Sequence, residues 1–198
     1  RSLWPPGLEA EGTPTTFTLE ERIATLEGGL QTLLVPSGLA AIALVDMALL
    51  KSGDEVLIPD NAYGPGKELA RNELAGWGVT HRFYDPMDPA SLSAAISPAT
   101  KLVWLEAPGS VTMEFPDLPA LLRIARDRSV LTALDNTLGA GVAFDAFDLA
   151  GAQEIAAEND LRTKRVALDQ FVGRSDVAPK PLLAPVVQIP HVGETVTF

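Results

Sequence analysis

Three places along the chain offer contacts that could together hold an anionic aromatic ligand. Ser37-Gly38-Leu39 follows a short apolar run and opens an apolar helix, and the free N–H groups and dipole of a helix start favour an anion. Tyr63 places an aromatic ring at the end of a second apolar run, and Asp135 places a carboxylate at the end of a third. Open α/β sheets bind ligands at the edge where parallel strands end.

This combination suits a planar, phosphorylated ring that contains nitrogen. The phosphate would accept hydrogen bonds at Gly38, the ring would stack on Tyr63, and Asp135 would keep the ring nitrogen protonated. A positively charged ring nitrogen makes the ring an electron sink, which is the chemistry of pyridoxal 5'-phosphate (PLP). Each residue alone has a plainer explanation, since Ser37 could be an ordinary helix cap and Asp135 a turn residue.

Several other functions lack the residues that they need. The segment GAGVAF at 139–144 has Phe144 where a dinucleotide fingerprint needs its third glycine, and neither a G-x-S-x-G elbow nor a P-loop is present. Without cysteine, and with only His81 and His191, a thiol nucleophile, a disulfide or a metal site of these residues is not expected. The net charge of −11 disfavours nucleic acid and anionic membranes as partners.

The composition, with 46% hydrophobic and 21% charged residues, is that of an ordinary globular protein. No apolar run reaches the length of about 18 residues that a membrane span needs. The N-terminal residues have no apolar core typical of a signal peptide. We therefore expect a soluble, cytoplasmic protein.

Short apolar runs alternate with helical patterns, which predicts a doubly wound α/β domain with a mainly parallel sheet. The run that ends at Glu106 delivers a second carboxylate at a strand end. The predicted strands cover 33–35, 55–59, 79–84, 101–106 and 130–134, and the predicted helices cover 18–26, 39–50, 67–77, 90–96 and 118–128.

Composition divides the chain into three parts. Residues 1–12 are rich in proline and glycine and should form an N-terminal arm. Residues 13–150 carry the strand–helix alternation and should form the cofactor-binding domain. Residues 151–198 form a divergent C-terminal segment whose proline-rich tail cannot be a regular helix, although it could contain edge strands.

Six segments, in the same order as in known enzymes, carry a resemblance to one family. They are GTPTTFTLE (12–20), LEGG (26–29), VPSGLAAI (35–42), DNAYGP (60–65), EAPGSVTMEFPD (106–117) and DNTLGAG (135–141). Over roughly 12–150 the chain resembles the Cys/Met-metabolism family of PLP enzymes, and MEFPD is similar to its cystathionine β-lyase branch. The resemblance implies fold type I, a PLP-dependent transferase-like large domain. Nothing in the chain matches the family's small C-terminal domain.

The resemblance also implies roles for individual residues. Backbone amides of Gly38 and Leu39 would bind the phosphate beside Ser37, the Tyr63 ring would stack on the cofactor, and Asp135 would pair with the pyridine nitrogen. Further cofactor contacts would come from Thr137 and Thr163, and Lys164 would be the catalytic lysine that holds PLP covalently.

Two departures from the family pattern bear on catalysis. Residues 8–11 read LEAE where the family carries a Tyr-Gly-Arg that binds the phosphate of a neighbouring subunit. The lysine can be aligned in two ways. One register matches Thr163-Lys164, whereas the other matches the segment GRSD at 173–176 and puts Asp169 in the lysine position, which would leave no catalysis.

The function that the resemblance implies is a PLP-dependent carbon–sulfur lyase. Such an enzyme cleaves cystathionine, a small amino-acid substrate, by β-elimination to homocysteine, pyruvate and ammonia, and it assembles as a homodimer or homotetramer. The alternative is a catalytically inactive or truncated β-lyase-like scaffold that acts as a binding or interaction module.

Overall fold

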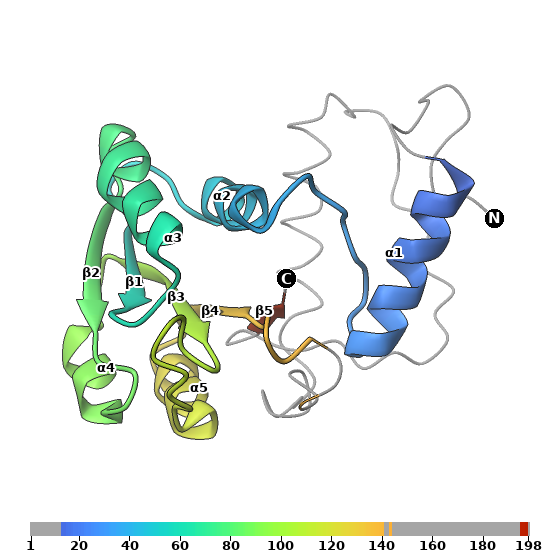
Figure 1. The fold of residues 1–198 in the computed structure, drawn as a ribbon. Coiled ribbons are helices and arrows are strands. Elements are labelled where there is room, and N and C mark those ends of the chain that lie inside the picture. The colour runs from blue at the N-terminus through green and yellow to red at the C-terminus, as the bar shows by residue number, and fades with distance from the viewer. Residues whose placement is uncertain (1–12, 141–142, 144–194, 198) are drawn as a thin grey trace.

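A five-stranded parallel sheet forms the centre of the computed structural model, which describes residues 13–140, 143 and 195–197 (Figure 1). The strands lie in the order β2-β1-β3-β4-β5, and all four pairings are parallel. Their bounds are β1 Glu55–Pro59, β2 Thr80–Tyr84, β3 Thr100–Glu106, β4 Leu131–Asp135 and β5 Thr195–Thr197. The ends of β1, β3 and β4 therefore meet at one edge of the sheet.

Four of the described α-helices begin at a residue whose side chain accepts a hydrogen bond from a free N–H group. Ser37 caps α2 by accepting the Ala40 N–H, and Asp117 caps α5 in the same way from Ala120. Gly28 ends α1 in the left-handed region, with φ of 71°. The helix bounds are α1 Pro14–Glu27, α2 Gly38–Leu49, α3 Gly64–Leu69, α4 Pro89–Ala95 and α5 Leu118–Asp127, and a π-helical turn, η1, covers Ala70–Leu74.

Apolar side chains cover both faces of the sheet, as a buried parallel sheet requires. On one face, Val56 and Trp104 of the sheet pack in a cluster with Ile42 of α2 and Leu74 of η1. On the other face, a second cluster joins the sheet to α4 and α5, and its members include Leu57, Leu92, Leu105, Leu121 and Leu134. Helices on both faces confirm the predicted doubly wound α/β architecture.

Three predicted elements differ from the structure. The strand predicted at 33–35 is wrong, because within the described residues this segment pairs with no strand, and Leu33 is 64% exposed. The helix predicted at 18–26 begins four residues earlier, at Pro14. The helix predicted at 67–77 begins three residues earlier, at Gly64, and passes into the π-helical turn. Within the proline-rich tail, β5 is one of the edge strands that the sequence allowed. The arm and the rest of the C-terminal segment lie outside the described residues.

Among the residues that the structure describes, no helix combines the length and the apolar character that crossing a membrane would demand.

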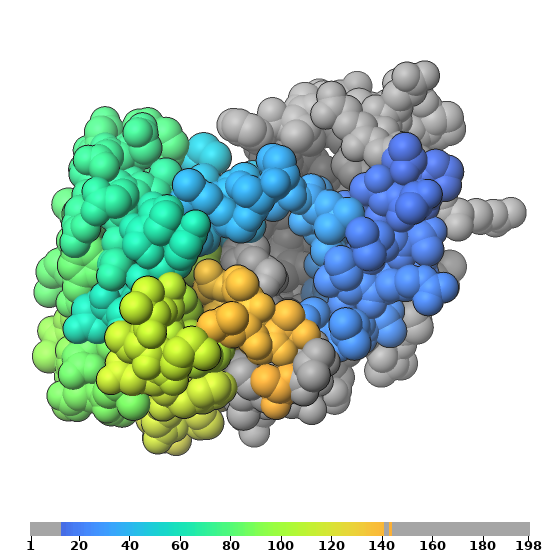
Figure 2. Space-filling view, viewed as in Figure 1, coloured from blue at the N-terminus to red at the C-terminus, as the bar shows by residue number. Residues whose placement is uncertain are grey.

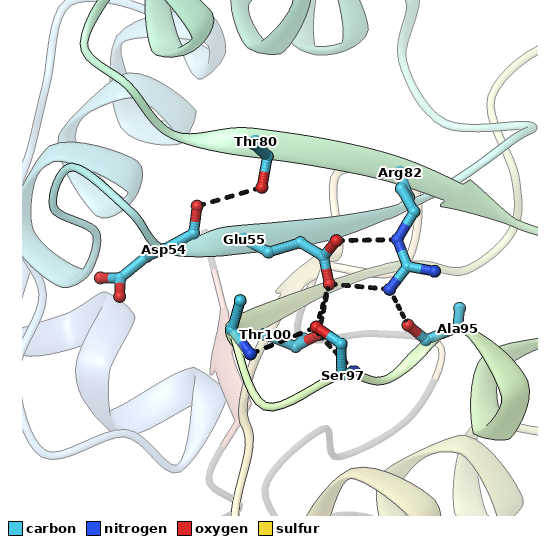
Figure 3. Close-up of polar contacts among 8 residues, drawn as sticks. Asp54, Glu55, Thr80, Arg82, Ala95, Ser97 and Thr100 are labelled. Atoms are coloured by element: carbon cyan, nitrogen blue, oxygen red, sulfur yellow. Dashed lines mark hydrogen bonds and ion pairs between the residues drawn. The ribbon is translucent and has the colours of Figure 1, made fainter.

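A polar network fixes the amino end of β1, opposite the ligand edge (Figure 3). The Glu55 carboxylate accepts hydrogen bonds from Arg82 Nε at 2.7 Å and Arg82 Nη2 at 2.9 Å, and from the Ser97 and Thr100 hydroxyls at 2.8 and 2.7 Å. Arg82 also donates to the Ala95 carbonyl. These contacts, led by Arg82, lower the pKa of Glu55 to about 2.

Replacing Arg82→Met should destabilise the fold by about 1–3 kcal/mol near pH 7, because Glu55 loses its charged partner. The lowered pKa of Glu55 stabilises the native state above the ordinary value of 4.5, and this contribution is lost as pH falls toward about 2. The difference between the two proteins should therefore shrink over that range in urea unfolding curves. Arg123→Met, at an exposed position of α5, is the control, and an equal loss there would contradict the prediction.

Candidate functional site

A shallow recess, open to solvent, lies at the edge where β1, β3 and β4 end. Ile42 and Asp46 of α2 form one wall, and Tyr63 and Lys67 at the start of α3 form another. The last residues of two adjacent strands, Glu106 and Asp135, line it as well; a parallel sheet delivers strand ends to a shared ligand edge in this way. Figure 2 shows the loop after β3, in yellow-green, below α3 and beside the segment that follows β4, in orange.

The structure brings together two of the residues that the sequence singled out. Tyr63 and Asp135 line the same recess, and the Tyr63 residue is 41% exposed. Oδ1 of Asp135 accepts the Thr137 N–H at 3.0 Å and the Thr137 hydroxyl at 2.5 Å. Thr137 thus orients the carboxylate without lining the recess. Both bonds use one oxygen, so within the described residues Oδ2 remains available to a ligand.

The start of α2 lies outside this recess. The Ser37 hydroxyl is occupied as the cap, at 3.1 Å from the Ala40 nitrogen. No described residue accepts a hydrogen bond from the Gly38 or Leu39 N–H, and the space where a Cβ of Gly38 would lie is open. Leu39 lines a neighbouring surface groove together with Lys67.

Lys67 lines both the recess and that groove, so it connects the two predicted contact regions. Its ammonium donates to the Asp60 carbonyl at 2.6 Å. Sequence reasoning missed Lys67, because a lysine early in a helix carries no signal until the helix is placed against a strand end.

Glu106 is the second carboxyl group of the recess, and the sequence had identified it only as a strand-ending carboxylate. Its Oε2 accepts the Tyr63 N–H at 2.8 Å. Burial raises the pKa of Glu106 to about 7, and the charge of the neighbouring Asp135 adds to the rise. Backbone hydrogen bonds from Tyr63 and Ser110, together with the Lys67 charge, act in the opposite direction.

Asp46 is an acid in the wall of the recess that the sequence did not indicate. It is 3% exposed, and its Oδ1 accepts the Trp104 indole N–H at 2.9 Å. Burial raises the pKa of Asp46 to about 6, against the lowering effect of the indole. The residues predicted to complete the site, Thr163 and Lys164, lie outside the described residues.

Comparison with known proteins decides the family. A family profile described as "Cys/Met metabolism PLP-dependent enzyme" matches residues 10–155. The chain belongs to this family. Its members use PLP, so the predicted cofactor and the predicted resemblance are confirmed at this level.

Members of this PLP-dependent family with curated names are about 40% identical to the chain over the aligned residues. Cystathionine beta-lyase MetC of Escherichia coli is 40% identical over 139 residues, which are 69% of this chain and 35% of that protein. A putative cystathionine beta-lyase of Saccharomyces cerevisiae is 41% identical over 135 residues, covering 68% of this chain and 40% of that protein. The chain thus spans less than half the length of these relatives.

A solved structure of another enzyme supports the fold. O-acetylhomoserine sulfhydrylase of Wolinella succinogenes matches with a TM-score of 0.66 and 31% identity, covering 69% of this chain and 39% of that one. The PLP-dependent transferase-like fold is therefore shown for the described region. The matched enzymes are named for different reactions, since the two sequence relatives are named as lyases and the structural match as a sulfhydrylase.

Replacing Asp46→Asn should change how stability depends on pH. An acid whose pKa rises on folding, here from 3.8 to about 6, destabilises the native state progressively as pH increases through that interval. The asparagine oxygen can still accept from Trp104, so the variant should gain roughly 2–3 kcal/mol relative to the wild type between pH 4 and 7. Thermal unfolding across this range measures the gain. Asp127→Asn, at an exposed position, should follow the wild-type profile, and an Asp46→Asn curve parallel to the wild type would refute the role of this acid.

Proposed function

We propose that the complete protein is a PLP-dependent carbon–sulfur lyase that converts cystathionine and water to homocysteine, pyruvate and ammonia. The observation that carries the proposal is that Tyr63 and Asp135 line one recess at the ligand edge of the sheet. Cystathionine beta-lyases at about 40% identity support this reaction over others in the family. Because an O-acetylhomoserine sulfhydrylase is among the structural matches, the main alternative reaction is a replacement, in which a sulfur nucleophile takes the place of the leaving group.

The residues of the recess fit PLP in their chemistry. Asp135 has a free carboxylate oxygen for a protonated ring nitrogen, and the half-exposed Tyr63 offers a face for stacking. The free N–H groups of Gly38 and Leu39, beside open space, suit a phosphate at the start of α2. When bound, PLP supplies the electron sink that stabilises a carbanion at the substrate α-carbon.

The chain's own groups would bind and move protons around this cofactor. Asp135, oriented by Thr137, would hold the proton on the ring nitrogen. Lys164, with Thr163 beside it, would attach the cofactor and then take the α-proton of the substrate. A lysine amine can do this only when its proton has been removed, which a desolvated or cationic environment favours.

A second candidate function is a scaffold that binds partners or the cofactor without catalysis. The family profile ends at residue 155, before Lys164, so the lysine lies beyond the matched region. In the register that puts Asp169 at the lysine position, covalent attachment would fail. PLP could still bind weakly through Tyr63 and Asp135 in that case.

We further propose that the protein forms a homodimer or homotetramer in the cytoplasm, in which each subunit contributes the cofactor-binding domain of residues 13–150. The apolar side chains of Leu26 and Leu33, which are 63% and 64% exposed, would be covered by a neighbouring subunit in such an assembly. Sedimentation of the purified chain tests this assembly, and a monomer at micromolar concentration would contradict it.

Borohydride reduction of the chain with PLP should fix a pyridoxyl group on Lys164, which peptide mass spectrometry locates. Lys164→Ala should lose the label and the visible absorption of bound cofactor, whereas Lys101→Ala, on β3, should keep both. If the pyridoxyl label were found on Lys67, the described lysine that lines the recess, then Lys67 rather than Lys164 would be the lysine that attaches the cofactor. No label on any lysine would favour the non-catalytic scaffold.

Asp135→Asn should weaken PLP binding roughly 10- to 100-fold, because the amide cannot neutralise a protonated ring nitrogen. Absorbance titration with PLP measures the dissociation constant. Asp85→Asn, in the turn after β2 and outside the recess, serves as the matched control. Equal affinity of the wild type and Asp135→Asn would remove Asp135 from the site.

A further inference from the structure

We propose that Glu106 is a positioning residue for the cofactor, because it holds the backbone of Tyr63 and thereby the ring that stacks on PLP. This inference rests on the proposed function. It assigns a role to a carboxyl group that lies beside Asp135 but acts through a different residue.

The central contact is the hydrogen bond from the Tyr63 N–H to Glu106 Oε2, at 2.8 Å. Tyr63 is the N-cap residue of α3, and its own side chain makes no capping hydrogen bond. Glu106 closes β3, whose register with β4 is fixed by backbone pairing. The bond therefore ties the start of α3 to the rigid sheet, across 43 positions of sequence.

A second set of contacts ties the loop after β3 to the loop after β1. Nδ2 of Asn61 lies 3.3 Å from both Thr112 Oγ1 and Glu114 Oε2. A Cβ at Gly109 would lie 2.2 Å from the same nitrogen, so only glycine permits this approach. Glu106 stands at the end of β3, directly before this loop, and accepts the Tyr63 N–H at 2.8 Å. Asn61 and Tyr63 are thus both held by residues at or after the end of β3.

The loop after β3 is held in an unusual conformation. The Gly109 N–H donates to the Glu114 carbonyl and the Met113 N–H to the Gly109 carbonyl, both at 2.9 Å. Val111 and Met113 have φ of 66° and 58°, a region that costs a non-glycine residue energy. Such backbone persists only where the surroundings determine it. The loop therefore has a defined shape where it contacts Asn61.

Glu106 acts as a hydrogen-bond acceptor for the Tyr63 N–H, whereas the proposed role of Asp135 requires a negative charge beside the ring nitrogen of the cofactor. The charged groups that act on Glu106 are Asp135 and Lys67, and with burial they leave its pKa at about 7. A neutral carboxyl group still accepts the Tyr63 N–H through its carbonyl oxygen. Glutamine at position 106 should therefore still accept the Tyr63 N–H and hold Tyr63 in place, whereas alanine should not.

The experiment uses the full 198-residue chain and two readouts. In the cofactor-free protein, Glu106→Ala should speed hydrogen exchange of the Tyr63 amide roughly tenfold, and with PLP it should weaken binding roughly tenfold. Glu106→Gln should stay close to the wild type in both. In a Tyr63→Ala background, Glu106→Ala should weaken PLP binding no further, since the two residues act as one unit. Glu73→Ala, an exposed carboxylate, is the control, and circular dichroism verifies that each variant folds.

Three results would overturn the inference. Glu106→Gln could be as damaging as Glu106→Ala, which would mean that charge rather than the acceptor matters. Glu106→Ala could weaken PLP binding equally with and without Tyr63, or leave Tyr63 exchange unchanged. Failure of the wild type to bind PLP would instead overturn the proposed function and the cofactor role with it, while the exchange measurement would still decide whether Glu106 fixes Tyr63.

Discussion

Burial of both faces of a parallel sheet is the constraint on which the rest of this structure depends. The side chains of a strand such as β3 pack into the core on both faces, with Val103 and Leu105 in one cluster and Leu102 and Trp104 in the other. Polar side chains that contact a ligand must therefore come from the residues where strands end and from the loops that follow. The recess lies at these positions, and its geometry is set by strand register.

The same constraint explains why acids gather there. Glu106 and Asp135 are register partners on adjacent strands, so their carboxyl groups are neighbours in a partly desolvated recess. Burial raises the pKa of Glu106 to about 7, and repulsion by the neighbouring Asp135 charge adds to the rise. A ligand with a cationic ring nitrogen would relieve the repulsion, which is consistent with the PLP dependence of the family.

The sequence predicted those parts of the fold that depend on local pattern. The strands 55–59 and 130–134 are short, mainly apolar runs, and Ser37 and Asp117 are good helix caps, so their positions agree with the structure to within a residue. The run 33–35 has the same apolar character but no partner strand, and composition does not reveal pairing.

Within the site, Tyr63 and Asp135 were predictable because each ends or follows a strand. Lys67, Asp46 and Asn61 were not, because each depends on a contact between elements that are distant in sequence. The Trp104 indole, for example, reaches Asp46 across 58 positions. The family likeness supplied Lys164 and Thr163, which the described residues do not include.

The strand β5 has a consequence for how the domain assembles. Its residues 195–197 come from the far end of the chain, yet they pair with β4, the strand that carries Asp135. Until they have been synthesised, the outer edge of β4 keeps unpaired N–H and C=O groups, which invite pairing with another molecule. Contacts between segments this distant form slowly, so the β4 edge closes only after the local strand–helix contacts of the sheet have formed.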